Sequence, residues 1–118
     1  MLLDSNIIIY RGQGKIFKTL ESSYGFASII TKIEVLGFTR LTEIERIDFI
    51  KFFNEIEILQ ITEEIAEIAI ELKTVRKISI PDAIIASTAL ANKMPLVTAN
   101  TKDFRWIDGL EIINPLEK

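Results

Sequence analysis

The chain has 118 residues, of which 48% are hydrophobic and 26% are charged, a balance that can fill one core. This length predicts a single domain over residues 1–118. The chain contains no cysteine and no histidine, which excludes disulfides, zinc–thiolate sites, Ser-His-Asp triads and HExxH-type metal sites. Its 14 basic and 17 acidic residues give a net charge of −3, which is not typical of a nucleic-acid binder.

No stretch of the sequence approaches the roughly 18 apolar residues that a membrane-spanning helix needs. The first four residues, MLLD, lack the basic segment and the long apolar run of a secretory signal peptide. We therefore expect a cytoplasmic protein, a location with which the absence of disulfides is compatible.

Short apolar runs alternate with longer helical patterns along the chain. The first run, residues 1–4, predicts a short buried strand, and further strands are expected at residues 25–28, 56–61, 96–98 and 111–113. Strands that alternate with helices indicate a parallel sheet covered by helices on both faces. The fold class is therefore α/β, and functional groups are expected beyond the carboxyl ends of the strands.

Three helical segments are also indicated. Thr42 and Glu45 form a capping-box pattern before one helix. Thr62 is the expected N-cap of the next, whose apolar positions recur with a helical period. Residues 82–92 are apolar almost all round, which predicts a helix that is buried on most sides. The helix after Thr42 carries more apolar residues than one core face needs, so it serves either a thick core or a contact with a partner.

Four acidic residues fall at strand ends or on neighbouring helices. Asp4 ends the first strand, and Asp103 follows the fourth. Asp82 comes after Pro81 at the start of the apolar helix. Glu34 shares part of an apolar helix face, where an inward-pointing carboxylate is costly unless it is paired or bound to a metal. Each acid also has an ordinary structural explanation, as a helix cap, a rim residue paired with lysine or a solvated loop residue.

The four carboxylates map to one edge of the predicted sheet. Like charges that lie close together resist ionisation unless a cation neutralises them. Oxygen ligands without cysteine or histidine suit Mg²⁺ or Mn²⁺, so the pattern predicts a site for one of these ions. Nearby hydroxyl and amide side chains are expected to orient the carboxylates or the water molecules on the metal. These side chains are Ser5, Asn6, Ser28, Thr31, Thr98 and Asn100.

Four motifs of this chain resemble those of PIN-domain nucleases. Residues 3–10, LDSNIIIY, resemble the family's opening motif, in which threonine more often follows the aspartate. Residues 28–34, with the pattern SxxTxxE, resemble the second motif, and residues 81–89, PDAIIASTA, resemble the most specific one. Residues 96–104, LVTANTKDF, resemble the last motif. The resemblance spans nearly the whole chain, and the compact domain is most similar to VapC-type toxins of prokaryotic toxin–antitoxin pairs.

The resemblance implies a PIN-like three-layer α/β/α sandwich with a central parallel sheet of about five strands. It further implies a ribonuclease that uses Mg²⁺ or Mn²⁺ and is paired with an antitoxin protein. By position, Asp4, Glu34 and Asp82 match the three core metal-binding acids of the family. Asp103 matches the fourth, more variable acid, and Asn100 shares or takes that role. The region 11–24 is shorter than is usual in the family, where it often contacts the antitoxin or the RNA.

The expected reaction is metal-assisted hydrolysis of a phosphodiester bond in RNA. Asp4 and Asp82 are the expected direct ligands of the metal. Glu34 and Asp103 are expected to hold a second metal ion or to position the attacking water.

The bulk charge needs correction for the predicted ligands. Once the four ligand acids are set apart, 13 acidic residues face 14 basic ones, so net charge neither supports nor excludes RNA as a substrate. Arg11, Lys15 and Lys102 are our candidates for binding the RNA backbone. Trp106 and Phe104 either stack on a base or pack the last strand into the core.

Two alternatives remain beside the nuclease. A receiver-type phosphoacceptor domain has the same fold class and an acidic Mg²⁺ pocket, but it needs an aspartate at the end of the third strand, and residues 56–61 offer none. A catalytically inactive PIN-like module that only binds a partner protein is disfavoured by the presence of all four acids. If the apolar surplus on the helix after Thr42 does not serve a thick core, it is expected to form a homodimer contact or a groove for an antitoxin helix.

Overall fold

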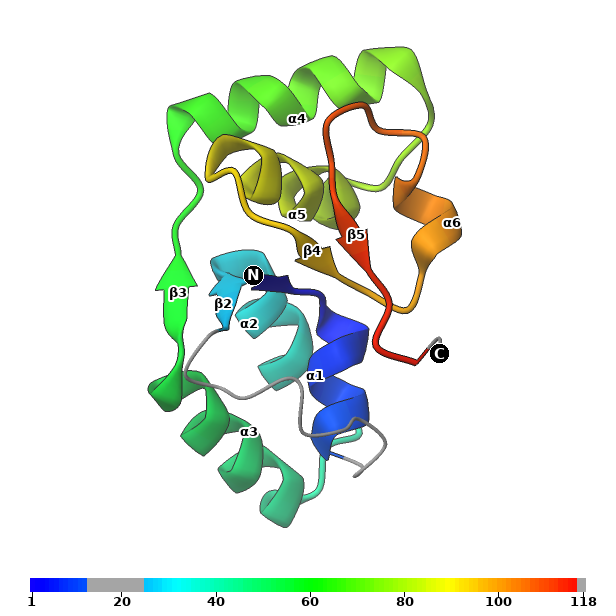
Figure 1. Cartoon of the computed structure of the whole chain (residues 1–118). Coiled ribbons are helices and arrows are strands. Elements are labelled where there is room, and N and C mark those ends of the chain that lie inside the picture. Colours follow the sequence, from blue (N-terminus) through cyan, green and yellow to red (C-terminus); the bar gives the residue numbers. More distant parts are fainter. Residues whose placement is uncertain (13–24, 117–118) are drawn as a thin grey trace.

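The computed structural model describes residues 1–12 and 25–116. At its centre is a parallel sheet of five strands in the order β3-β2-β1-β4-β5 (Figure 1). The strands are β1 Leu2–Leu3, β2 Phe26–Ser28, β3 Glu57–Leu59, β4 Leu96–Val97 and β5 Ile112–Ile113. All five predicted strands are therefore confirmed, and each is shorter than its predicted apolar run.

Helices connect the strands and cover both faces of the sheet. In the described part of the chain they are α1 Ser5–Gly12, α2 Ile29–Leu36, α3 Glu43–Glu55, α4 Glu63–Val75, α5 Ile80–Ala91 and α6 Thr101–Phe104. Figure 1 shows α1, α2 and α3 below the sheet and α4 and α5 above it. The predicted three-layer α/β/α sandwich is therefore confirmed.

The predicted helix starts are observed, with one shift. Thr42 and Glu45 each bond the other's backbone N–H and form a complete capping box at the start of α3. Thr62 caps α4. The apolar helix predicted at residues 82–92 begins earlier, at Ile80, because the hydroxyl of Ser79 caps it and places Asp82 within its first turn.

Each face of the sheet carries its own hydrophobic core. Leu2 and Leu96 are buried in the core shared with α4 and α5. The residues that follow them, Leu3 and Val97, belong to the core shared with α1, α2 and α3. Successive side chains of a strand point to opposite faces, so even two-residue strands anchor the sheet to both layers.

The apolar residues of α3 divide between the two expected roles, a thick core and a contact with a partner. Phe49, Phe52 and Phe53 are buried and fill the lower core. Ile44 and Ile47 remain 74% and 60% exposed, so they are surplus to this core. No helix within residues 1–12 and 25–116 has the length and apolar character needed to cross a membrane.

The order of the strands determines where a site can form. The chain winds from β1 to β2 and β3 on one side, and then crosses to β4 and β5 on the other side. Ligand sites of parallel α/β sheets lie where the winding reverses, beyond the carboxyl ends of the strands. Asp4 directly follows β1 and Thr98 directly follows β4, so both lie at this point.

Candidate active site

Asp4 is the most buried of the four candidate acids. Its side chain is only 4% exposed. Oδ2 accepts a hydrogen bond of 2.7 Å from the hydroxyl of Thr98, and Oδ1 accepts one of 2.8 Å from the backbone N–H of Ser5. The amide of Asn6 donates a longer hydrogen bond of 3.2 Å to Oδ2. Donors from the two halves of the chain therefore fix this carboxylate in one orientation.

Glu34 lies on the exposed rim of α2, beside the start of α1. Its Oε1 accepts a hydrogen bond of 2.8 Å from the hydroxyl of Ser5. The sequence left open whether this carboxylate points inward or meets a lysine at the rim. The structure shows the rim position, with Ser5 and not a lysine as the partner among the described residues. Ser5 thus links Asp4 and Glu34, through its backbone N–H and its hydroxyl.

Asp82 and Asp103 come from the upper layer of the fold. Asp82 is half-buried in the first turn of α5, where its backbone N–H donates a hydrogen bond of 3.2 Å to the hydroxyl of Ser79. Asp103 is exposed on the short helix α6. Both line a polar hollow of about 260 Å³, so the structure brings these two acids together as predicted.

The carboxyl groups of Asp4 and Asp82 resist ionisation. Burial is the main cause that raises the pKa of Asp4; the hydrogen bond from Thr98 opposes the rise, and the charges of Asp82 and Glu34 add to it. Burial also raises the pKa of Asp82, and the charges of Asp103 and Glu34 raise it further. Repulsion therefore links all four acids, although they come from four separate parts of the chain.

The donor set of this site suits a hard divalent cation held by few direct ligands. Within the described ranges, no group of three or more acidic side chains is arranged to hold one metal ion. Mg²⁺ commonly keeps several water molecules and binds through one or two carboxylates. Asp4 and Asp82 fit that pattern, because both are desolvated and neither has an ion-pair partner among the described residues.

Three of the six side chains predicted to orient the carboxylates contact them. These are Ser5, Asn6 and Thr98. Asn100 is exposed and acts through its backbone, whose N–H donates a hydrogen bond of 3.0 Å to the Thr98 hydroxyl. Asn100 therefore supports Thr98 and does not itself contact an acid in the described structure.

Ser28 and Thr31 contact none of the carboxylates in the described part of the chain. The hydroxyl of Ser28 is engaged in capping α2, where it accepts a hydrogen bond of 3.2 Å from the N–H of Ile30. The hydroxyl of Thr31 is buried and has no hydrogen-bond partner among the described residues. Thr31 precedes Glu34 by about one turn on α2, so it lies on the same side of that helix.

The predicted RNA-binding cations divide between two places. Lys102 lines the hollow that holds Asp82 and Asp103. Arg11 lies at the far end of α1, where its guanidinium group stacks over the ring of Phe52 at 4.5 Å. Arg11 therefore does not line the hollow of Asp82 and Asp103; it lines a separate groove that also contains Glu34. Lys15 lies outside the described residues, as does most of the region 11–24.

Sequence analysis missed two cations at the hollow. Arg76 and Lys77 line it together with Trp106, which the sequence had left open between base stacking and the core. Only Ile78 separates these two cations from the Ser-x-Pro-Asp start of α5, and that closeness to a predicted ligand was the available signal.

Comparisons with known proteins agree with this geometry. A family model described as the PIN domain matches residues 1–110. Ribonuclease VapC1 of Rickettsia felis is 32% identical over an alignment that covers 100% of this chain and 98% of that protein. The chain therefore belongs to the PIN-domain family.

Solved structures show the same fold. A toxin–antitoxin complex from Klebsiella pneumoniae contains a chain that is 30% identical, with a TM-score of 0.79 over 99% of this chain and 98% of that one. The DNA-bound VapBC of Salmonella typhimurium has a TM-score of 0.81 over 95% of each chain at 22% identity, which supports the fold alone.

The raised pKa values predict how stability depends on pH. Because the folded protein favours the protonated forms of Asp4 and Asp82, their contribution to stability is complete below the ordinary aspartate pKa of about 4 and is lost as pH rises through the raised values. In EDTA, we expect the free energy of unfolding of Asp4→Asn, relative to the wild type, to increase from about pH 4 to pH 7. Denaturant unfolding at a series of pH values measures it.

Asp108→Asn is the control for this experiment, because it removes a carboxylate from an exposed turn. A relative free energy of unfolding that stays constant or falls with pH in Asp4→Asn would contradict the electrostatic account of the site.

Proposed function

We propose that the protein is an endoribonuclease that depends on Mg²⁺ or Mn²⁺ and acts as the toxin of a toxin–antitoxin pair. The observation that carries the proposal is the oriented, buried carboxylate of Asp4 beside the half-buried Asp82, at the reversal point of a PIN-domain sheet. Membership of the family and the names of the relatives at 30% identity or above support it. The cytoplasmic location stays a prediction.

In this proposal, each residue of the site has a separate role in binding the cation or orienting the attacking water. Asp4 and Asp82 hold the cation, and Thr98, Asn6 and the Ser5 N–H keep the Asp4 carboxylate aimed at it. A bound divalent ion would neutralise the scissile phosphate and lower the pKa of an attacking water. Glu34, whose Oε1 is held by the hydroxyl of Ser5, would accept a hydrogen bond from an attacking water and orient it. The exposed Asp103 acts through its charge on Asp82.

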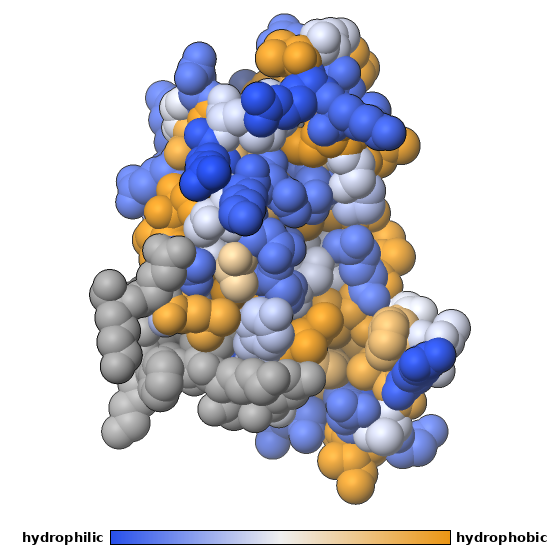
Figure 2. Space-filling model, turned by 90° about the vertical axis from the view of Figure 1, so that its right-hand side faces the viewer, coloured by the Kyte–Doolittle hydropathy of each residue, from blue (hydrophilic) through white to orange (hydrophobic). Residues whose placement is uncertain are grey.

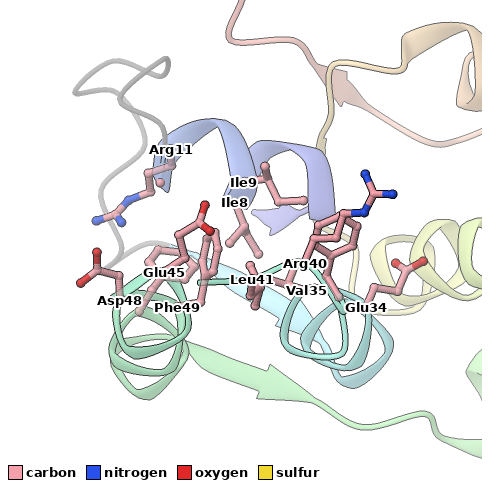
Figure 3. A pocket seen from close by; sticks show the side chains of 13 residues that line it. Ile8, Ile9, Arg11, Glu34, Val35, Arg40, Leu41, Glu45, Asp48 and Phe49 are labelled. Carbon is pink, nitrogen blue, oxygen red and sulfur yellow. The ribbon is translucent and has the colours of Figure 1, made fainter. Parts of the chain in front are cut away.

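A groove between α1, α2 and α3 supports an antitoxin as partner. It has a volume of about 330 Å³ and an apolar floor that includes Ile8, Leu41 and Phe49 (Figure 3). Glu34 lines the groove, so a protein segment bound there would contact one of the four candidate acids. The Klebsiella pneumoniae relative was solved as a toxin–antitoxin complex.

A homodimer remains part of the proposal. The exposed Ile44 and Ile47 of α3 are apolar surface that a second copy would cover.

The receiver-type alternative is wrong, because β3 ends at Leu59 without an acid and the chain belongs to the PIN-domain family. The inactive binding module is the remaining alternative, and a cleavage assay separates it from the nuclease.

Cleavage of a mixed RNA pool tests the activity. We expect cutting with Mg²⁺ or Mn²⁺ and none in EDTA. Asp4→Asn and Asp82→Asn should each lower the rate by about 100-fold or more, since changes behind a metal ligand already cost roughly 10- to 100-fold. Asp108→Asn, the exposed control, should cut like the wild type. Gel analysis of the RNA products gives the rates.

Two results would count against the nuclease. Equal rates of RNA cleavage by the wild type and by Asp82→Asn would show that the proposed site does not catalyse the reaction. The absence of cutting by folded, antitoxin-free protein under every metal condition would favour the inactive binding module.

Thr98 provides a separate test of how Asp4 is oriented. Thr98→Val keeps the shape of the side chain but removes the hydroxyl that donates to Asp4, so we expect cleavage to fall by roughly 10- to 100-fold. Thr98→Ser keeps the hydroxyl and should retain most of the activity. Initial rates at saturating metal distinguish the two variants, and equal rates for both would show that this hydrogen bond does not orient the ligand.

A further inference from the structure

The polar hollow beside the acids has a second group of residues on its wall. Besides Asp82 and Asp103 it is lined by the cations Arg76, Lys77 and Lys102. They come from two segments, the loop before α5 and the helix α6. In Figure 2, which shows the side of the molecule where α6 lies, hydrophilic residues form a band down the middle of the surface.

Trp106 gives the hollow an aromatic wall. The guanidinium group of Arg76 stands 5.1 Å from the centre of the indole ring. The indole N–H donates a hydrogen bond of 2.8 Å to the carbonyl oxygen of Asp103, which fixes the ring relative to α6. Trp106 is partly exposed, so the stacked pair of Arg76 and Trp106 remains accessible from outside.

The loop that carries the cations is also held in place. Lys73 donates a hydrogen bond of 2.7 Å to the carbonyl oxygen of Ile78, and the N–H of Arg76 bonds the carbonyl of Leu72. Arg76, Lys77 and Lys102 themselves form no ion pair with any described carboxylate. The hollow therefore presents three cations without an ion-pair partner among the described residues, together with Asp82, whose charge a bound metal would offset, and Asp103.

This combination fits one nucleotide of a single-stranded nucleic acid. Guanidinium and ammonium groups bind phosphate oxygens, and aromatic rings and guanidinium planes stack on unpaired bases. An acidic peptide offers charge to the cations but nothing that needs the stacked pair. Single-stranded RNA offers phosphates to the cations and unpaired bases to the stacked pair of Arg76 and Trp106.

We propose that the hollow is a substrate subsite for an unpaired nucleotide next to the scissile phosphate. Its phosphate binds Arg76 and Lys102, and its base stacks on the pair formed by Arg76 and Trp106. The inference rests on RNA as the substrate of the proposed function and assigns recognition to residues outside the metal ligands. It explains why a protein with a net charge of −3 can hold RNA, since the positive charge is local.

Trp106 is the only tryptophan of the chain, so its fluorescence reports directly on the hollow. A single-stranded RNA of about ten nucleotides, within the usual site size for such grooves, is titrated into Asp4→Asn protein in EDTA, where metal-dependent cleavage is absent. We expect the emission of Trp106 to change as the RNA binds, and fluorescence anisotropy of labelled RNA to give the same affinity. Double-stranded RNA should leave the emission unchanged.

Variants in the same background assign the contacts. Arg76→Ala and Lys102→Ala should each weaken binding by about 5-fold or more and reduce the slope of log K against log salt by about 0.7 per lost phosphate contact. Lys51→Ala, which removes an exposed lysine from α3, should change neither. Trp106→Ala should weaken binding by about 5- to 100-fold.

The proposal is overturned if RNA binds without a change in Trp106 emission, or if the Arg76 and Lys102 variants bind like the Lys51 control. Polyglutamate that binds as tightly as the RNA, with the same emission change, would identify the hollow as a site for an acidic protein instead. Absence of RNA binding would also overturn it. None of these results affects the cleavage assay, so loss of the subsite and loss of the nuclease are distinguishable.

Discussion

The burial of the Asp4 carboxylate, to which the charges of Asp82 and Glu34 add repulsion, is the constraint on which this structure depends. Asp4 is almost fully buried at the end of the central strand, and no described cation pairs with it. Its hydrogen bonds hold the carboxylate in place without neutralising it, and the charge of Asp82 opposes its ionisation. Because no described cation pairs with these acids, the proposed function assigns the balancing charge near neutral pH to a bound divalent cation.

The fold delivers this arrangement through very short strands. Leu2 and Leu3 anchor β1 in opposite cores, so the position of Asp4 is determined by packing on both faces of the sheet. Thr98 holds the same position at the end of β4, which pairs with β1 in parallel register. The hydrogen bond between these side chains joins residues 94 positions apart in the chain. A shift in the register of either strand would therefore separate Asp4 from Thr98.

Much of this could be predicted from the sequence, for identifiable reasons. Strand positions, the caps at Thr42 and Thr62 and the charge interactions among the four acids follow from local patterns and from the rule that parallel strands end at one edge. The roles of single side chains were harder to predict from the sequence, because they depend on contacts between segments that are far apart in the chain. Nothing local shows that Ser28 is engaged as a cap, that Arg11 turns to Phe52, or that Arg76 stacks on Trp106 thirty positions away.

The central claim is that Asp4 and Asp82 together require a divalent cation. Calorimetric titration of Mn²⁺ into the metal-free wild type near neutral pH tests it most directly, with Asp4→Asn titrated in parallel. The account predicts saturable binding to the wild type, accompanied by a higher midpoint of thermal unfolding, and loss of both effects in the variant. Equal affinity of Mn²⁺ for the two proteins, or no binding to the wild type, would contradict it.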